Sequence, residues 1–282
     1  MSAALLSAAA LSAALSLGCR GAPQGAAAPG ALGVEHTLPV PFDLREGIER
    51  AALLGTNLFL LDASTARAWD ALIARIGAAK GDQIGHYLAL LGANDDGRFD
   101  GSVQVLFFTN EHVPRMSYRV RVSGGPGYHS DVLEHDPPRL VHEPLMSLLN
   151  ARLVALEALP PTTQAVNPVL IPQRDGQLVV YLLAATAQPN VAVLGRHYRV
   201  EVSEDGSEVE RVTALSPSEL ELPTRDGSGQ RLGALAISDR LMEHPTETHV
   251  FASRMANVPI YVTTSRGRWK VRASVIDFLG PP

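Results

Sequence analysis

The hydrophobic pattern between residues 177 and 213 predicts three consecutive β-strands. Residues 178–185 are apolar on both sides, which is typical of a strand buried on both faces. Residues 197–203 alternate between apolar and polar side chains, which predicts one face in the core and one face in water. Residues 204–207 contain the Asp and Gly of a tight turn, so residues 208–213 should return as a third strand. We expect this β-meander to lie at the centre of the sheet.

The central strand has a counterpart earlier in the chain. Residues 118–123 read YRVRVS and residues 198–203 read YRVEVS. Each copy follows a run that is apolar on both faces, and each precedes a turn that contains glycine. Chance similarity is the alternative, because Tyr, Val and Arg suit half-buried strands in general. The repeat predicts two similar β-units.

Two regions have the spacing of helices. Residues 42–76 have an apolar stripe, and Asp43 with Glu46 three residues later has the spacing of a capping box. A second possible capping position lies near the middle of this region. The pattern therefore fits either one kinked helix or an αα-hairpin. Residues 144–159 form a leucine stripe that ends at a pair of prolines.

The remaining strand patterns complete the predicted fold. They lie at residues 86–91, 103–109, 116–123, 167–171, 232–242 (running into a short helix), 248–253, 258–264 and 268–273. The order of elements predicts an α+β fold of antiparallel β-meanders with N-terminal helices and one central helix. The short connections disfavour parallel crossovers. We assign the folded domain to residues 42–282, with 42–159 and 160–282 as candidate halves.

The start of the chain has the pattern of an export signal. Residues 3–17 are an uncharged run of mainly Ala, Leu and Ser, shorter than the roughly 20 residues that cross a bilayer, which favours a signal peptide over residues 1–18. Cys19 directly after Leu-Gly resembles the lipobox of bacterial lipoproteins. The resemblance implies cleavage before Cys19 and attachment of lipid to it, and Arg20 implies the outer membrane. The alternative is a plain signal peptide, which gives a soluble secreted or periplasmic protein.

A linker follows this signal. Residues 19–41 are rich in Gly, Ala, Pro and Gln, and predict a flexible tether. Cys19 is the only cysteine, so no intramolecular disulfide can form. Each CH₂ of an attached lipid adds about 0.8 kcal/mol of membrane affinity, so two or more acyl chains would anchor the protein stably.

Composition and motifs narrow the functional classes. The chain has 282 residues and a formal net charge of -5, without a block of like charge. This balance argues against nucleic acid as a partner, because that partner needs clustered Lys and Arg. No nucleophile elbow, phosphate loop or dinucleotide fingerprint occurs, and we predict no cofactor.

One segment gathers side chains that can bind a metal ion. His244, Glu247 and His249 lie close together in the sequence, and His197 could join them from the polar face of the central strand. Zinc accepts imidazole nitrogen and carboxylate oxygen in tetrahedral sites. The spacing differs from that of a zinc-protease helix, and Pro245 interrupts the segment. The alternative is that Glu247 caps a turn and His249 is an ordinary strand residue.

A second acidic segment is a weaker metal candidate. Residues 94–101 form a turn that superficially resembles a calcium loop. Gly92 and Val103 stand where the first Asp and the last Glu of such a loop should be, so we expect a plain turn.

A series of short runs extends through the second half of the chain. They read NPVLIP (167–172), DG (175–176), VYL (180–182), GRHYRV (195–200), DG (205–206), PTETHVF (245–251), PIYV (259–262) and WKV (269–271). The series resembles a family of exported proteobacterial proteins and lipoproteins of uncharacterised function. The resemblance implies an envelope setting and supplies no activity or catalytic residue.

Two functions from different classes follow. The first is a non-catalytic binding or interaction module in the periplasm, held at the outer membrane by lipid on Cys19, with a protein or another envelope component as partner. The second is a metal-dependent hydrolase that uses His244, Glu247, His249 and His197. The absence of a catalytic motif favours the first.

Overall fold

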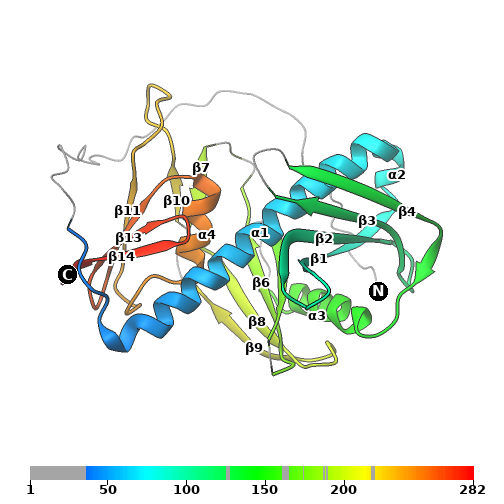
Figure 1. The fold of residues 1–282 in the computed structure, drawn as a ribbon, viewed down its shortest axis with the longest axis horizontal. Coiled ribbons are helices and arrows are strands. Elements are labelled where there is room, and N and C mark those ends of the chain that lie inside the picture. The colour runs from blue at the N-terminus through cyan, green and yellow to red at the C-terminus, as the bar shows by residue number, and fades with distance from the viewer. Residues whose placement is uncertain are drawn as a thin grey trace.

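A computed structural model describes residues 36–124, 128–160, 165–173, 175–186, 188, 190–216 and 220–282. The predicted signal peptide, Cys19 and most of the predicted tether lie outside the described residues. The predicted α+β class is confirmed, with mostly antiparallel sheets. Figure 1 shows the long helix α1 (Arg45–Ile76) crossing the molecule diagonally, with strands on both sides of it.

Helix α1 is continuous over 32 residues, so the single helix is formed and the αα-hairpin is not. It follows the 3-10 helix η1 (Phe42–Leu44) and ends at Gly77, whose φ of 80° breaks the helix. The single turn α2 (Ala78–Gly81) comes next. Apolar and small residues recur along the buried side of α1: Ile48, Ala51, Gly55, Leu58, Leu61, Ser64, Ala68 and Leu72.

The predicted capping box at the start of this helix is wrong. The N-cap position is Leu44, which makes no capping hydrogen bond with its side chain. Asp43 instead pairs with Arg266, with 2.7 Å between Oδ2 and Nη2. A long-range ion pair to the C-terminal sheet therefore replaces the local cap.

The first half of the chain forms a four-stranded antiparallel sheet in sequence order. Its strands are β1 (Ile84–Ala93), β2 (Phe99–Thr109), β3 (Arg115–Ser123) and β4 (His129–Leu140). The pattern predicts the first three. It misses β4, because this edge strand is mostly exposed and contains two prolines.

A second four-stranded antiparallel sheet contains the predicted meander. Its strands are β5 (Val166–Pro172), β6 (Leu178–Ala184), β8 (Tyr198–Val202) and β9 (Val209–Ala214). Between β6 and β8 the chain forms β7 (Val191–Val193), which pairs with β10 (Glu221–Pro223). These two strands were not predicted, because three residues are too few to give a pattern.

The repeated motif occupies equivalent places in the two sheets, as expected for two similar β-units. β3 and β8 are each third in strand order and pair with a largely buried second strand. They present opposite faces to α1, however. Val120 and Val122 of β3 belong to the core under α1, whereas Val200 and Val202 of β8 pack against the central helix α3 (Leu145–Glu157).

This reversal corrects one prediction about β8. The face expected to lie in water is covered: His197 is 0% exposed and Glu201 is 8% exposed. That face lies under α1 and the start of α4 (Glu247–Ala256). The polar residues of this strand are therefore interior residues that need partners.

The C-terminal sheet contains the one parallel strand pair among the described residues. Its order is β11 (Leu235–Asp239), β12 (Ile260–Thr264), β13 (Arg268–Arg272) and β14 (Val275–Gly280). α4 is the crossover between the parallel strands β11 and β12, an arrangement that the short connections seemed to disfavour. β14 was not predicted, and the helix expected after β11 is a turn.

The strand predicted at residues 248–253 is wrong, because these residues belong to α4. Their Thr, Val and Phe side chains favour a strand locally. A capping box at Thr246 and burial against α1 outweigh that preference.

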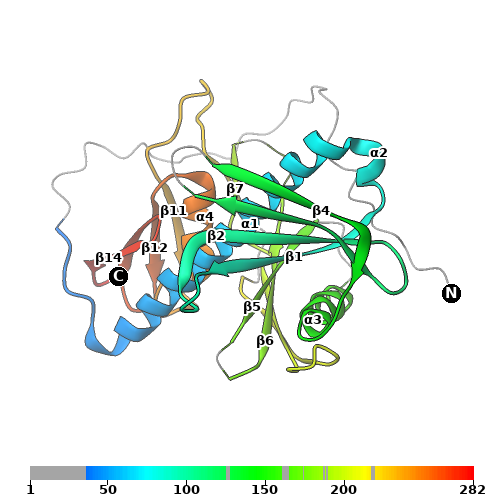
Figure 2. The ribbon, with the colours of Figure 1, turned by 45° about the vertical axis from the view of Figure 1, so that its right-hand side comes forward.

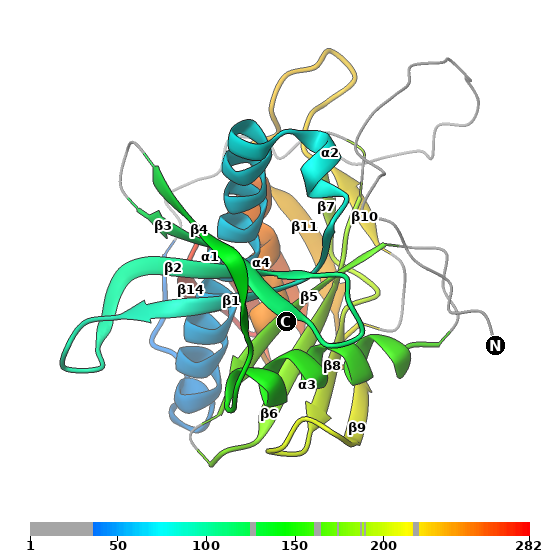
Figure 3. The same cartoon turned by 90° about the vertical axis from the view of Figure 1, so that its right-hand side faces the viewer.

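Two helices pack on opposite faces of the first two sheets. α1 packs on the inner faces of both sheets through Leu58, Leu61 and Leu72. α3 packs on their other faces, with Leu149 against the first sheet and Ala155 against the second. Figures 2 and 3 show α3 lying between β1 and the second sheet. The N-terminal half of α1 continues into the core of the C-terminal sheet.

Gly55 marks the closest approach of α1 to α4. A Cβ atom at this position would lie 2.4 Å from the backbone oxygen of Glu247 and 2.5 Å from Cβ of Val250. Because both neighbours belong to a packed helix, no flexible side chain can move aside.

We predict that Gly55→Ala destabilises the protein by about 1–3 kcal/mol, because the added methyl group forces α1 and α4 apart. Urea denaturation of the wild type and the variant measures this. Gly233→Ala is the matched control, since nothing lies within 4 Å of a Cβ there. Equal stability of the Gly55 and Gly233 variants would contradict the close crossing.

Candidate functional site

The four residues predicted to bind a metal lie around the start of α4. His249 belongs to the capping box: its Nδ1 accepts a hydrogen bond from the backbone N–H of Thr246 at 3.0 Å. Its Nε2 lies 3.7 Å from Oδ2 of Asp239. Burial, and then the neighbouring His197 and His244, lower the pKa of His249 to about 4, so the ring is neutral at pH 7.

His197 is a structural residue with both ring nitrogens in use. Nδ1 accepts from the backbone N–H of Ala184 at 3.0 Å, and Nε2 lies 3.4 Å from the carbonyl oxygen of Val193. The edge of Phe251 meets its ring at 6.2 Å between centroids. Burial lowers the pKa of His197 to about 4. This histidine therefore ties β6, β7 and α4 together.

His244 and Glu247 face a different environment. Nδ1 of His244 donates to the carbonyl oxygen of Pro245 at 2.8 Å. A Cβ at Gly47 would lie 2.3 Å from its Nε2, so the imidazole packs directly on the backbone of α1. Oε1 of Glu247 accepts a hydrogen bond from the hydroxyl of Tyr181 at 3.1 Å.

These contacts leave the metal hypothesis without support. The part of the chain that the structure describes contains no group of three or more His, Cys, Asp or Glu residues that could hold a metal ion. The three histidines are neighbours, but each uses at least one ring nitrogen in an internal hydrogen bond. They serve to fix the start of α4.

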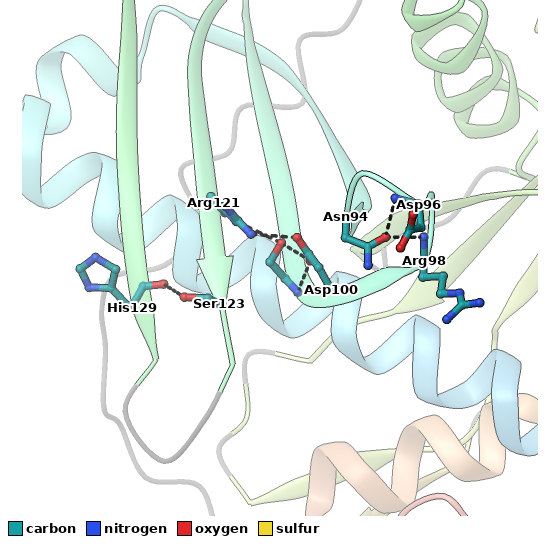
Figure 4. Close-up of polar contacts among 8 residues, drawn as sticks. Asn94, Asp96, Arg98, Asp100, Arg121, Ser123 and His129 are labelled. Atoms are coloured by element: carbon teal, nitrogen blue, oxygen red, sulfur yellow. Dashed lines mark hydrogen bonds and ion pairs between the residues drawn. The ribbon is translucent and has the colours of Figure 1, made fainter.

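The acidic turn between β1 and β2 also uses its side chains internally (Figure 4). Oδ1 of Asn94 accepts from the backbone N–H groups of Asp96 and Arg98, at 3.1 Å and 2.9 Å. Asp100 pairs with Arg121 of β3 at 2.8 Å. Residues 94–98 form a turn, as expected, whereas residues 99–101 already belong to β2, and the polar groups of the segment stabilise a β-hairpin.

A pocket of about 390 Å³ lies between α1, β6, β8 and the start of α4. Tyr181 and Glu247 line one part of it, and Arg50 of α1 contributes a guanidinium. Burial, and then the charge of Glu247, raise the pKa of the Tyr181 phenol, so it remains a donor at neutral pH. The pocket therefore presents a fixed donor–acceptor pair beside a cation.

Charged side chains on the sheet form the other part of the lining. Glu201 is paired on both oxygens: Nη2 of Arg199 lies 3.3 Å from Oε1, and Nε of Arg211 lies 3.1 Å from Oε2. Nε of Arg199 is buried and has no hydrogen-bond partner among the described residues. This group is an unsatisfied donor at the pocket.

A wider hollow of about 850 Å³ lies beside α3 and the turn between β8 and β9. Its polar groups serve local structure: Ser147 donates to Glu143, and Ser203 donates to Asp205. The Ser203 hydroxyl, and then the Ser207 N–H, lower the pKa of Asp205 to about 2. The polar pocket under α1 is the stronger candidate site.

The sequence predictions missed most of this pocket. Tyr181 belongs to a run that reads as wholly apolar, and Arg199 and Glu201 read as solvent-facing. A usable signal existed. Two opposite charges on one face of a strand expected at the sheet centre indicate interior charges, which are seldom buried without partners.

Comparisons with protein-family models, curated proteins and solved structures give no match for this chain. The resemblance to exported proteobacterial proteins therefore stays a prediction. None of the helices in the described part of the chain is both long and apolar enough to cross a bilayer.

The buried histidines predict a pH-dependent stability. The pKa of His249 is about 4 in the folded state and near 6.5 when unfolded, so the unfolded chain binds more protons between these values. The stabilising contribution of each neutral ring is fully present above pH 6.5 and is lost as the pH falls towards 4. We expect the free energy of unfolding to fall by about 2–4 kcal/mol between pH 7 and pH 5 because of His197 and His249 together.

His249→Gln isolates this effect, because Gln at the third helical position preserves a capping box without a charge. Urea denaturation at pH 7 and pH 5 should show a loss about 2 kcal/mol smaller in the variant than in the wild type. Asp62, whose pKa burial raises to about 6, acts in the opposite direction in both proteins. Equal losses in the two proteins would show that His249 is not held neutral.

Proposed function

We propose that this protein is an exported lipoprotein, anchored through Cys19, whose folded body binds a small polar ligand in the pocket between α1, α4 and the second sheet. The observation that carries the proposal is the buried Glu201 between two arginines, next to the Tyr181–Glu247 hydrogen bond. The pocket supports a binding function over a catalytic one, because the Tyr181–Glu247 and Arg199–Glu201 pairs hold polar groups in fixed positions on its wall.

The energetics of buried charge support this reading. Burying Glu201 and partly burying Arg199 cost desolvation energy, and well-packed apolar residues often stabilise a fold as well or better. The equivalent position to Glu201 in the first sheet is Arg121, which is exposed. A charged interior face is thus not required by the β-unit itself. Its place beside a pocket is typical of a ligand site.

The path of the chain is compatible with an anchor. The backbone N–H of Leu38 donates to the carbonyl oxygen of Phe278 at 2.8 Å, so the described chain begins against the edge strand β14. A tether over residues 20–35 would reach up to about 55 Å, at about 3.4 Å per residue. Such a tether would leave the pocket accessible from the periplasm.

We predict that Cys19→Ser moves the protein from the membrane fraction to the soluble periplasmic fraction, because the acyl chains supply the membrane affinity. Fractionation of cells that express each form, with a blot for the protein, measures this. An unchanged membrane fraction in the variant would contradict anchoring through Cys19.

A thermal-shift screen tests the pocket. Amino acids, short peptides, sugars, nucleotides, dicarboxylates and polyamines are each added to the mature chain with Cys19→Ser. At least one class should raise the melting temperature by a few degrees, because a ligand that binds only the folded state stabilises it.

Tyr181→Phe should weaken that binding about tenfold, since it removes the donor that fixes Glu247. Tyr198→Phe is the matched control, because Tyr198 packs against the core around α3 on the other face of the sheet. A screen without any stabilising compound, or equal binding by both variants, would refute a ligand site here.

A further inference from the structure

We infer that the ligand is a zwitterion with a free ammonium group and a free carboxylate, namely an α-amino acid or a short peptide. This inference rests on the proposed function and adds the chemical class of the ligand. It follows from the sign and the pairing of the charges in the pocket, from the size of the pocket and from the apolar residues in its lining.

Both signs of charge line the same pocket. Arg50 and Arg199 are the cations, and Asp175, Glu201 and Glu247 are the anions. A purely anionic ligand would meet two or three carboxylates, and a purely cationic ligand would meet two guanidinium groups. Arg50 and Asp175 are exposed, whereas Glu201 and Glu247 are more shielded. Like charges placed close together are disfavoured, so a ligand of one sign fits poorly.

Internal pairing decides which groups are left for a ligand. Glu201 is satisfied by Arg199 and Arg211. Arg50 has no hydrogen bond or ion pair within the described residues, and its charge acts on the Tyr181 phenol inside the pocket. The guanidinium of Arg50 therefore offers donors for a carboxylate.

The acceptor side of the pocket lies on α4. Glu247 uses Oε1 to accept from Tyr181, and no bond to its Oε2 is found in the described residues. This oxygen can accept from an ammonium group, which has three donors.

Size and apolar surface favour a small amino-acid compound. The volume of about 390 Å³ lies at the lower end of the range for small-molecule sites. Ala51, Leu54 and Val179 add apolar surface to the lining, which an aliphatic side chain can cover.

Blocked peptides test the inference directly. Isothermal titration of the mature chain with Cys19→Ser uses leucine, Ala-Leu and Ala-Ala-Leu, and then N-acetyl and C-amide forms of whichever binds best. We expect one free form to bind, and each blocked form to bind at least tenfold more weakly, because each block removes one charge.

Two variants assign the ends of the ligand. Glu247→Gln should weaken binding of the free peptide and leave binding of the N-acetyl form unchanged. Arg50→Gln should weaken binding of the free peptide and leave binding of the C-amide form unchanged. Glu49→Gln, an exposed neighbour on α1, is the control and should change neither.

Each outcome separates the inference from the function on which it rests. Equal binding of free and blocked forms overturns the zwitterion and leaves the pocket as a ligand site. If no peptide binds but another class of compound stabilises the protein in the thermal screen, the zwitterion is likewise overturned and the ligand site is kept. Failure of every compound in both experiments overturns the ligand site and the zwitterion together.

Discussion

The close crossing of α1 and α4 at Gly55 is the contact on which the rest of the structure depends. It lets the backbone of Glu247 approach α1 at a distance that no side chain at residue 55 would permit. This approach sets Glu247 against Tyr181 of the second sheet. Because α1 also packs on the first sheet, one helix joins all three four-stranded sheets of the described chain and closes one side of the pocket.

The pocket arises from one strand motif used in two orientations. In the first sheet the apolar face of the repeated strand packs under α1, and Arg119 and Arg121 are exposed. In the second sheet the apolar face packs on α3 instead, so Arg199 and Glu201 lie under α1. The same alternating pattern therefore gives a solvated face in one unit and a charged interior face in the other.

Hydrophobic periodicity predicts most of this fold. It fails where contacts between distant parts of the chain determine the secondary structure of a segment or the face that is buried. The meander strands and the central helix follow from local patterns, because their burial alternates as the sequence does. The segment of residues 248–253 reads as a strand and folds as a helix, because its cap and the contact of α4 with Gly55 outweigh β-propensity. His197 reads as solvent-facing, since strand alternation does not tell which of two faces a helix covers.

The candidate site could be predicted only in part from the sequence, because contacts between distant residues form it. Glu247 stands out beside two histidines, and it does line the pocket. Its partner Tyr181 lies 66 positions away in an apolar run, and only the fold joins them. A metal site was the alternative hypothesis for the clustered histidines, and the hydrogen bonds show two of these imidazoles in a cap and a packing contact.

Backbone amide hydrogen exchange tests the central claim most directly, namely that α1 is a single rigid element shared by all three sheets. The account predicts that amides from Ile48 to Leu72, together with those of α4, exchange with one common opening free energy. If the first half of α1 opened with the C-terminal sheet while the second half stayed protected, the shared helix and the pocket that it closes would be contradicted.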